Sequence, residues 1–418
     1  MGESMSDGLR LLFIANFLFL AACSNGKSSE SVFPEKSTDS PGLPSSCEGL
    51  RIEGEFVAVW EDGSVTRENG VDREQMIRDF VEPNLEQLKR VDYNYEIKTE
   101  IVNSNSSAAP NWHHDDVNSH YAWDNNYKGQ GVLVAVIDSG VDISHPDLDG
   151  QIYTNNAEIP NNGIDDDRNG YVDDYQGFDF FNESGNVTDP NGHGTHVAGI
   201  IAGLHQSSPG NPLSGTNGVY GIAPGVKILP IRFMSSTGSG DLADAIKAVG
   251  YAADQGASII NASWGASVCS GTLYEKIAEV ESKGVLFVAA SGNSSNNADN
   301  YPEYPGAFIA NNILSVAATS DIGALAWFSN YGLSTVDVGA PGEDIYSLAP
   351  NSGVKTLSGT SMATPLVAGM AAILKSVKPS ASYAELKDVI EKSVDNSQIQ
   401  VRTRGTVNVK SALNYMGY

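Results

Sequence analysis

The stretch VLVAVIDSG at residues 132–140 decides the fold, because an unbroken apolar run ends there at a carboxylate. Six apolar residues in a row, bounded by glycines, are typical of a strand that is buried on both faces of a parallel sheet. Asp138 closes the run, and the carboxyl ends of parallel strands are where such sheets carry their functional side chains. The stretch predicts an α/β domain with polar chemistry at one edge of its sheet.

Two later stretches place a polar side chain at the start of a predicted helix. They read HGTHVAG at residues 193–199 and SGTSMATP at residues 358–365, and we expect helices over 193–203 and 361–375. Pro365 would lie in the first turn of the second helix, where a missing N–H costs little. A serine hydroxyl needs a base within reach and a third group to orient that base. The chain order Asp, His, Ser is one of those known for hydrolytic triads. It predicts that Asp138 orients the base, that His193 is the base and that Ser361 is the nucleophile.

The remaining element of such a site is a donor for the developing oxyanion. Backbone N–H groups at the start of the helix that carries Ser361 can supply part of it. A side-chain donor is expected as well, and Asn293 follows another buried-strand pattern in VAASGN at residues 288–293.

These segments, and those between them, closely resemble the subtilisin-like (subtilase) serine peptidases from about residue 112 to residue 413. The resemblance implies a three-layer α/β fold with a mostly parallel central sheet flanked by helices. It assigns the base to His193 rather than His196, and the oxyanion role to Asn293. It also implies two extended edges that pair with the substrate backbone, at Gly238, Ser239 and Gly240 and at Ser263, Trp264 and Gly265.

The predicted walls of the primary pocket, residues 263–265 and 291–293, supply no carboxylate that would favour Arg or Lys. A broad preference for apolar or aromatic residues follows. Met362, directly after the nucleophile, is expected to be sensitive to oxidation.

Length and charge agree with a single large catalytic domain. The 418 residues carry a net charge of −26, which excludes a nucleic-acid partner because phosphate binding needs a basic surface. Apolar runs that alternate with Ala-rich stretches such as residues 242–253 indicate βαβ units. We expect a monomer that acts on proteins or peptides and needs no organic cofactor.

Part of the acidity is concentrated in residues 161–174. Asp165, Asp167 and Asn169, followed by Gly170, reproduce the opening of a calcium loop, although Gln176 replaces the glutamate that would end an EF-hand. The stretch resembles the calcium-binding insertion of some subtilases, and the alternative is an acidic solvated loop. The implied ligands are Asp165, Asp167, Asn169, the Tyr171 carbonyl, and Asp173 or Asp174. A second site at Asp147, opposite the loop near residues 217–219, is implied by the resemblance alone.

The front of the chain carries processing signals. Residues 11–22 fit the apolar core of a signal peptide, and LAAC at residues 20–23 resembles the bacterial lipobox. Residues 1–23 would then be a lipoprotein signal ending at a lipidated Cys23, which would tie the precursor to the membrane. Glu3 and Asp7 offset the positive charge expected at its start, so an ordinary signal peptide is the alternative. Residues 24–50 are typical of a flexible tether.

Residues 51–103 are predicted to form a small α+β module with strands at 54–60 and 93–102 and a helix at 72–90, broken near Pro83. It stands where subtilases carry an inhibitory propeptide. We expect processing between Asn103 and Pro110, which leaves residues 104–418 as the catalytic domain. The mature enzyme would then be released or held non-covalently. Cys47 and Cys269 lie on opposite sides of the predicted processing site. They could form a disulfide bridge between the two parts, but two separate thiols are the simpler expectation.

Two other classes of protein fit less well. A non-catalytic binding protein at the cell surface would show a damaged triad or lack Asn293, and neither is seen. An esterase of the Gly-x-Ser-x-Gly type would need a glycine at position 363, which is Ala363. The sequence therefore predicts an exported, calcium-stabilised serine endopeptidase.

Overall fold

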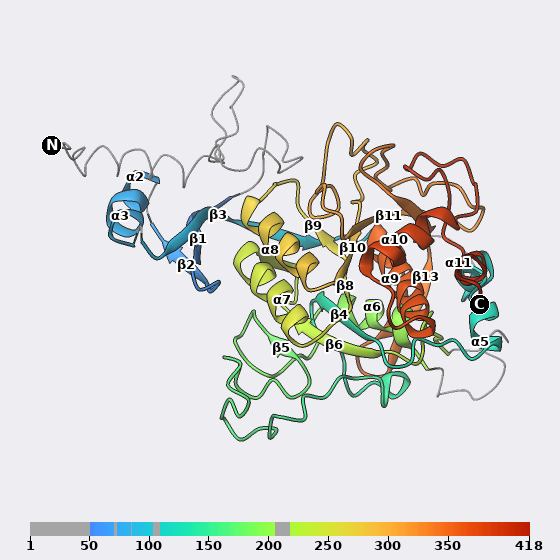
Figure 1. Cartoon of the computed structure of the whole chain (residues 1–418), viewed down its shortest axis with the longest axis horizontal. Helices are drawn as coiled ribbons and strands as arrows, with labels where there is room; N and C mark the ends of the chain where they lie inside the picture. Colours follow the sequence, from blue (N-terminus) through green and yellow to red (C-terminus); the bar gives the residue numbers. More distant parts are fainter. Residues whose placement is uncertain (1–50, 71–72, 85, 103–108, 205–217) are drawn as a thin grey trace.

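The computed structural model describes residues 51–70, 73–84, 86–102, 109–204 and 218–418. The predicted signal peptide, Cys23 and the tether lie outside these residues. The described chain forms a small N-terminal module and a large α/β domain (Figure 1).

The core of the large domain is a seven-stranded sheet in the order β12-β11-β10-β8-β4-β6-β5, and every pair of neighbours is parallel. Runs of Val, Ile, Leu and Ala fill both faces, as burial on two sides requires. The strand predicted at residues 132–137 is confirmed, with Asp138 as its last residue. The strands are β4 (Leu133–Asp138), β5 (Phe178–Asp179), β6 (Lys227–Arg232), β8 (Ile259–Ala262), β10 (Leu286–Ala290), β11 (Ile313–Thr319) and β12 (Val338–Pro341).

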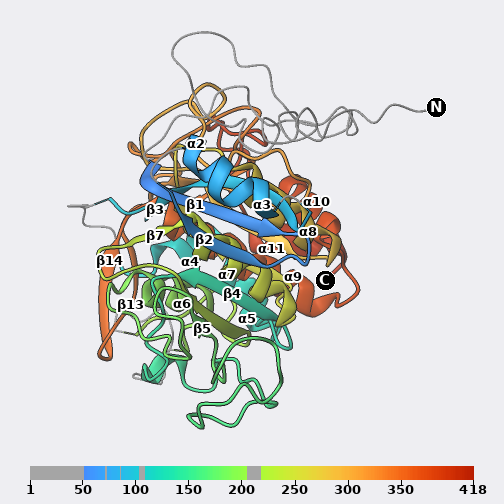
Figure 2. The same cartoon turned by 90° about the vertical axis from the view of Figure 1, so that its left-hand side faces the viewer.

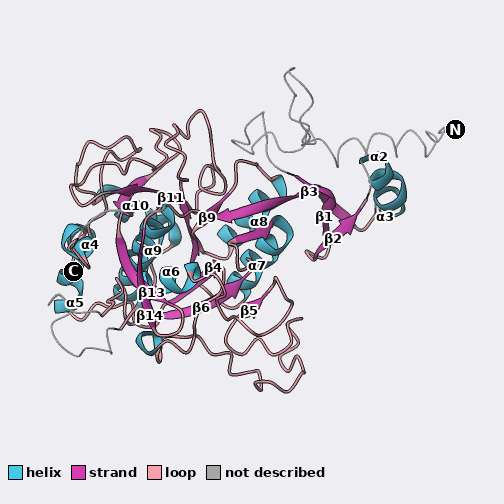
Figure 3. Cartoon of the chain, turned by 180° about the vertical axis from the view of Figure 1, so that it is seen from behind, coloured by secondary structure: helices cyan, strands magenta, loops and turns pink. Residues whose placement is uncertain are grey.

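Helices cover both faces of this sheet, which confirms the predicted three-layer architecture (Figure 3). One face carries α7 (Leu242–Asp254) and α8 (Gly271–Ser282). The other packs against α6 (His193–Ala202) and α9 (Thr360–Val377), with α10 (Tyr383–Lys392), α11 (Val409–Met416), α4 (Trp112–Asp116) and α5 (Ser119–Asp124) outside them. The short turn η2 (Pro146–Leu148) and a hairpin of β13 (Ile345–Ala349) and β14 (Gly353–Leu357) complete the domain.

The central helix α9 is long and apolar enough to cross a membrane, the one such helix among the described residues, but 83% of its apolar window is buried inside the protein. It is therefore a core helix. It begins at Thr360, so Pro365 lies in its second turn. The prediction from the sequence, which put Pro365 in the first turn, is wrong. A proline there leaves the carbonyl of Ser361 without its helical N–H donor. Ser263 replaces that donor, because its Oγ–H donates to the Ser361 carbonyl oxygen at 2.9 Å.

The N-terminal module is an antiparallel sheet in the order β2-β1-β3, covered by a short helical segment. Its elements are β1 (Arg51–Trp60), β2 (Val65–Asn69), α2 (Arg73–Met76), the π-helical turn η1 (Ile77–Val81), α3 (Glu82–Asn84) and β3 (Leu88–Thr99). The predicted helix at residues 72–90 is wrong at its end, because Leu88 already pairs with Trp60 of β1 and is buried in the module. The sequence did not predict β2.

Charged side chains seat the module on the N-terminal ends of α7 and α8. The carboxylate of Asp92 accepts the backbone N–H of Thr272 at 3.0 Å, at the start of α8, where the helix dipole favours an anion. Arg67 forms ion pairs with Asp241, at 2.6 Å, and with Asp244 at the start of α7. The module is thus docked by specific polar contacts.

The strand β3 leaves the module and continues across the large domain (Figures 1 and 2). There it pairs antiparallel with β7 (Ser239–Asp241) on one side and with β9 (Trp264–Gly265) on the other. One strand therefore belongs to both parts of the molecule.

Candidate active site

The carboxyl end of β4 and the start of α6 bring Asp138 and His193 together. Asp138 Oδ1 lies 2.7 Å from His193 Nδ1, and both side chains are fully buried. The N–H of Ser139 donates to the same Asp138 oxygen at 2.7 Å, which fixes the carboxylate. His193 Nε2 is also buried and has no hydrogen-bond partner among the described residues. The imidazole is therefore oriented through one nitrogen, and the other is left available for chemistry.

Ser361 is the second residue of α9, and its hydroxyl faces a peptide carbonyl of the chain itself. Its Oγ–H donates to the carbonyl oxygen of Glu100, the residue that follows β3. Its Oγ also lies 3.3 Å from Met362 Sδ, so the thioether borders the hydroxyl of the predicted nucleophile. The hydroxyl of the predicted nucleophile, Ser361, is therefore in contact with the peptide carbonyl of Glu100.

Asn293, which follows β10, presents its amide to the same carbonyl. Its Oδ1 accepts the N–H and the hydroxyl of Thr360 at 2.9 Å and 3.0 Å, so the amide cannot rotate freely. Its Nδ2 is buried and lacks a hydrogen-bond partner among the described residues. A Cβ on Gly359 would collide with the Glu100 carbonyl oxygen and lie 2.9 Å from Ser361 Oγ and 3.3 Å from Asn293 Nδ2. These atoms surround one small space that only glycine leaves open.

The two predicted backbone edges lie on either side of β3. Ser239 and Gly240 pair with Lys98 and Ile97, while the Gly238 carbonyl accepts the N–H of Thr99 at 3.0 Å. On the other side, Trp264 and Gly265 pair with Thr99 and Lys98. Past the site, the N–H of Val102 donates to the Ser358 carbonyl at 2.7 Å. The chain from residue 96 to residue 102 is held in an extended form through the site.

The side chain of Trp264 points into the core, where its Nε1–H donates to the Ile137 carbonyl at 2.9 Å and its ring packs edge-on against Phe233. It therefore shapes the fold rather than the pocket. Ser263, grouped with Trp264 from the sequence, serves the Ser361 carbonyl as described above.

The Glu100 side chain lies beside a second carboxyl group, that of Glu303. Glu303 Oε1 accepts the Ser294 hydroxyl at 2.8 Å and the Asn330 amide at 3.0 Å. Burial, followed by the negative charge of Glu303 and a hydrogen bond to it, raises the pKa of Glu100 to about 8. Sequence reasoning missed Glu303, because it reaches the pocket from a third segment with no local motif.

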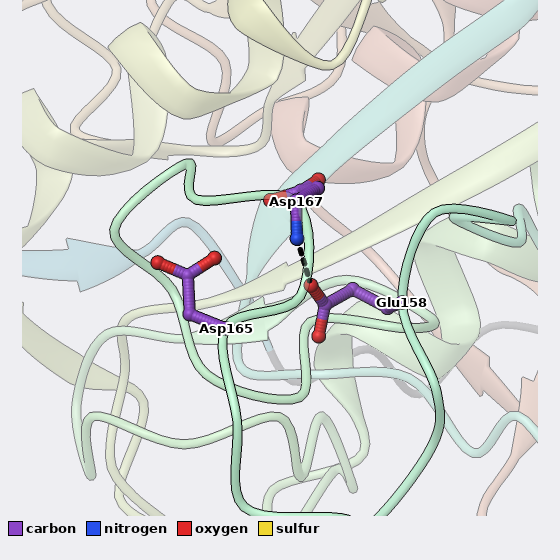
Figure 4. Close-up of side chains that lie close together, drawn as sticks. All are labelled: Glu158, Asp165 and Asp167. Carbon is purple, nitrogen blue, oxygen red and sulfur yellow. Dashed lines mark hydrogen bonds between the residues drawn. The ribbon is translucent and has the colours of Figure 1, made fainter.

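A carboxylate cluster lies in the acidic loop, where Glu158, Asp165 and Asp167 bring one oxygen each within 4.8 Å of one another (Figure 4). Glu158 is 4% exposed, and its Oε1 accepts the N–H groups of Asp166 and Asp167 at 2.8 Å and 3.0 Å. Its Oε2 is buried without a hydrogen-bond partner among the described residues. A buried, unpartnered carboxylate oxygen beside two more carboxylates suits a hard cation such as calcium. Glu158 precedes the motif, and the sequence did not single it out.

The other residues expected at this site make contacts within the protein. Asp173 accepts the N–H groups of Asn162 and Gly163 at 2.9 Å and 3.0 Å, and so closes the loop. Asp174 accepts the Tyr251 hydroxyl at 2.8 Å. The amide of Asn169 donates to Asp167 and Asp174.

The ring of Tyr171 packs against Phe178 and Tyr251. At the predicted second site, Asp147 is buried in η2, and Asn217 of the partner loop lies outside the described residues. Cys269 is disulfide-bonded, to a partner outside the described residues, so the interpretation as two separate thiols is wrong for this residue.

A sequence model of the subtilase family matches residues 129–414. The chain belongs to the subtilase family. Thermitase of Thermoactinomyces vulgaris is 36% identical over 293 residues, which cover 70% of this chain and 90% of thermitase. A cell wall-associated protease of Bacillus subtilis (strain 168) is 38% identical over 264 residues, which cover 63% of this chain and 26% of that protein.

A solved structure, described as a cold adapted subtilisin-like serine proteinase, superimposes with a TM-score of 0.53 at 32% identity. The match covers 68% of this chain and 89% of that one. Other relatives are longer: this subtilase spans 59% of a thermophilic serine proteinase of Bacillus sp. (strain AK1) and 17% of subtilisin-like protease 2 of Plasmodium falciparum. The family and the fold confirm the prediction of a serine endopeptidase.

Proposed function

We propose that this subtilase is a self-processing, calcium-stabilised endopeptidase whose triad is Asp138, His193 and Ser361. The observation that carries the proposal is the Glu100 carbonyl, which accepts a hydrogen bond from Ser361 beside the unpartnered Asn293 amide. A predicted nucleophile is thus in contact with a peptide carbonyl, beside an amide donor, which supports these roles. For attack, the Ser361 hydroxyl would turn its proton from this carbonyl to His193 Nε2, which has no hydrogen-bond partner among the described residues.

The chemistry follows from these positions. Ser361 Oγ attacks the carbonyl carbon while His193 takes the hydroxyl proton through Nε2. Asp138 accepts the Nδ1–H and stabilises the imidazolium that forms. Asn293 Nδ2 and the N–H groups at the start of α9 stabilise the oxyanion. The amine leaves with the proton from His193, and water then hydrolyses the acyl-enzyme.

The module predicted at residues 51–103 would act as an inhibitory prosegment. Support comes from β3, which fills both substrate edges and so excludes another peptide. The cut predicted from sequence between Asn103 and Pro110 stays a prediction, and residues 103–108 lie outside the described part. The catalytic domain would extend to residue 418, as the match over residues 129–414 supports.

Calcium would be held by Glu158, Asp165 and Asp167, whose oxygens converge with one of them unpartnered. It would supply fixed positive charge that keeps the acidic loop folded. Asn169, Tyr171, Asp173, Asp174 and Asp147 stay predicted ligands, and the contacts of Asp173 and Asp174 favour a supporting role. Without calcium, the carboxylates within residues 161–174 would repel one another.

Export with lipidation at Cys23, followed by release of the mature enzyme, completes the proposal on sequence grounds alone. The preference for apolar or aromatic residues also stays a prediction. Glu303 places a carboxyl group beside the Glu100 side chain, in the pocket for the residue before the cut bond. Cleavage rates of peptides with Phe, Leu, Arg or Glu at this position would measure the preference. A non-catalytic binding protein is the alternative, and it requires that no peptide be cut.

The test compares the wild type with Ser361→Ala, and with Ser282→Ala on the exposed end of α8 as control, each expressed as the full chain with calcium. We expect the wild type and the control to shed the prosegment and to hydrolyse casein, whereas Ser361→Ala does neither. Intact masses and casein assays measure this. Casein hydrolysis by Ser361→Ala would remove Ser361 from the mechanism.

A further inference from the structure

Glu100 occupies the position of a residue whose carbonyl is about to be attacked. Its carbonyl oxygen contacts Ser361, the strand before it fills both substrate edges, and Val102 beyond it is bonded to Ser358. Among the described residues, these contacts place the peptide bond between Glu100 and Ile101 at the predicted nucleophile.

We propose that this subtilase cuts itself at the Glu100–Ile101 bond, and that Glu303 holds the Glu100 side chain through a shared proton, so that the cut prosegment is retained in acid and released as the pH rises. The inference rests on the proposed function, since it assumes that Ser361 is the nucleophile. It places the cut upstream of the predicted window at residues 103–110.

The covalent steps balance without any added reactant except water. Ser361 Oγ forms a bond to the Glu100 carbonyl carbon as its proton passes to His193. The bond to the Ile101 nitrogen then breaks, and that nitrogen leaves as an amine with the same proton. Water attacks the resulting ester, gives one proton to His193 and returns the serine hydroxyl. The products are a Glu100 α-carboxylate and an Ile101 α-amine.

Gly292 leaves room for the Glu303 carboxyl group, and a side chain at Gly265 would come within ordinary contact distance of the Glu100 carboxyl group. A Cβ on Gly292 would collide with the Glu303 carboxyl group. A Cβ on Gly265 would lie 3.4 Å from Glu100 Oε1, on the strand that pairs with β3. The Glu100 and Glu303 carboxyl groups are hydrogen-bonded to each other. A hydrogen bond between two carboxyl groups needs one proton between them, because an ionised carboxylate can only accept.

Glu303 is the charged group that acts on the Glu100 carboxyl group among the described residues. Two further charged side chains belong to the site and to the bound strand, one on α6 and one on β3. His193 of α6, the proposed base, is held by Asp138 at 2.7 Å. Lys98 of β3 is paired with Glu96 at 3.0 Å and is exposed. The new α-carboxylate would lie beside Ser361 and Asn293. All of these are retained when Glu100 or Glu303 is changed to glutamine, so a comparison of variants isolates the carboxyl pair.

The direction of the pH effect follows from linkage. The pKa of Glu100 is about 8 in the bound strand, whereas a free glutamate titrates near 4.3. The bound form therefore carries a proton that the released form loses between these values. Affinity for the prosegment is greatest below the lower value, falls by up to about tenfold per pH unit through the window, and levels off above about pH 8.

The experiment uses the full chain with calcium, in a Cys269→Ser background that removes the disulfide. After self-cutting at pH 5, the sample is diluted into buffers from pH 6 to 8. The rate constant at which casein hydrolysis appears is measured and normalised to its own plateau. The variants are Glu100→Gln, Glu303→Gln and the control Glu96→Gln, whose carboxylate on the same strand is bound to Lys98.

We expect the mature chain to begin at Ile101 by mass spectrometry. We also expect the release rate of the parent and of Glu96→Gln to rise at least about tenfold more between pH 6 and 8 than that of Glu100→Gln or Glu303→Gln. A Ser361-dependent cut at another bond overturns the assigned site but leaves the proposed function standing. An equal pH response in the glutamine variants overturns the shared proton. Absence of both cutting and casein hydrolysis in every chain overturns the proposed function itself, and this inference with it.

Discussion

At the scale of single residues, Asn293 is the proposed donor for the oxyanion, and its amide is already held in place. Thr360 holds its oxygen, and its nitrogen faces the carbonyl without a partner among the described residues. A donor fixed in advance costs no reorganisation when the oxyanion forms.

Asn293→Ala should lower kcat by about 10²–10³ and leave KM nearly unchanged, the range known for loss of such a donor in subtilisin itself, a member of this family. Steady-state kinetics on a peptide substrate measures this. Asn311→Ala removes an exposed amide and should keep wild-type kinetics. An effect of Asn293→Ala on KM alone would mean that the amide binds the ground state.

At the scale of elements, α9 contains a proline whose missing donor is supplied by Ser263. Ser263→Ala should destabilise the chain by about 1–3 kcal/mol, because the Ser361 carbonyl is then buried without a partner. Pro365→Ala restores an N–H within the helix, so the double variant should recover part of the loss. Denaturant unfolding in a Ser361→Ala background, which prevents self-digestion, measures the cycle. Strictly additive effects would show that the two residues do not share this carbonyl.

The acidic loop is a second element whose ligands can be separated by substitution. Glu158→Gln should abolish the rise in Tm that calcium produces, because it removes the charge of the buried oxygen. Asp173→Asn should keep a calcium-dependent rise, since its carboxylate is bonded to Asn162 and Gly163. Thermal unfolding with calcium and with a chelator distinguishes the two. A calcium response lost only in Asp173→Asn would restore the ligand set inferred from the sequence.

At the scale of the whole molecule, the module and the catalytic domain are joined by charge as well as by β3. Burial, then the neighbouring charge of Asp241, raises the pKa of Asp244 to about 7, and Arg67 acts in the opposite direction. A carboxyl group whose pKa is raised on folding contributes stability below its unfolded value near 3.9, and this is lost as the pH rises through about 7.

Arg67→Gln should therefore cost less near pH 5, where the pair with Asp241 remains, than near pH 8, where Asp244 is ionised as well and the loss should be about 1 kcal/mol. Unfolding of the uncut Ser361→Ala chain at both pH values measures the difference. Arg78→Gln, which removes an exposed pair with Asp79, should have the same small effect at each pH. A larger loss for Arg67→Gln in acid would contradict the assigned role.

The features that could be predicted from the sequence are those that depend on local interactions. Apolar runs and helix starts are local, so the position of Asp138 at the end of β4 and of His193 at the start of α6 could be predicted. Glu303 and Glu158 could not, because each reaches its site through loop packing between distant segments. The second-turn position of Pro365 was missed for a related reason. The proline is tolerated there because Ser263, which is 98 residues before Ser361 in sequence, bonds the Ser361 carbonyl.

The continuity of β3 from the module into the site would also set the kinetics of the proposed activation. A strand tethered to its own catalytic domain is delivered at the concentration of the chain itself, which for short linkers is on the order of millimolar whatever the amount of protein in solution. Self-cutting would therefore be first-order, with a half-time that dilution leaves unchanged. Each molecule would become active at a rate that is fixed once it has folded, and the time course of a whole sample would not depend on the protein concentration.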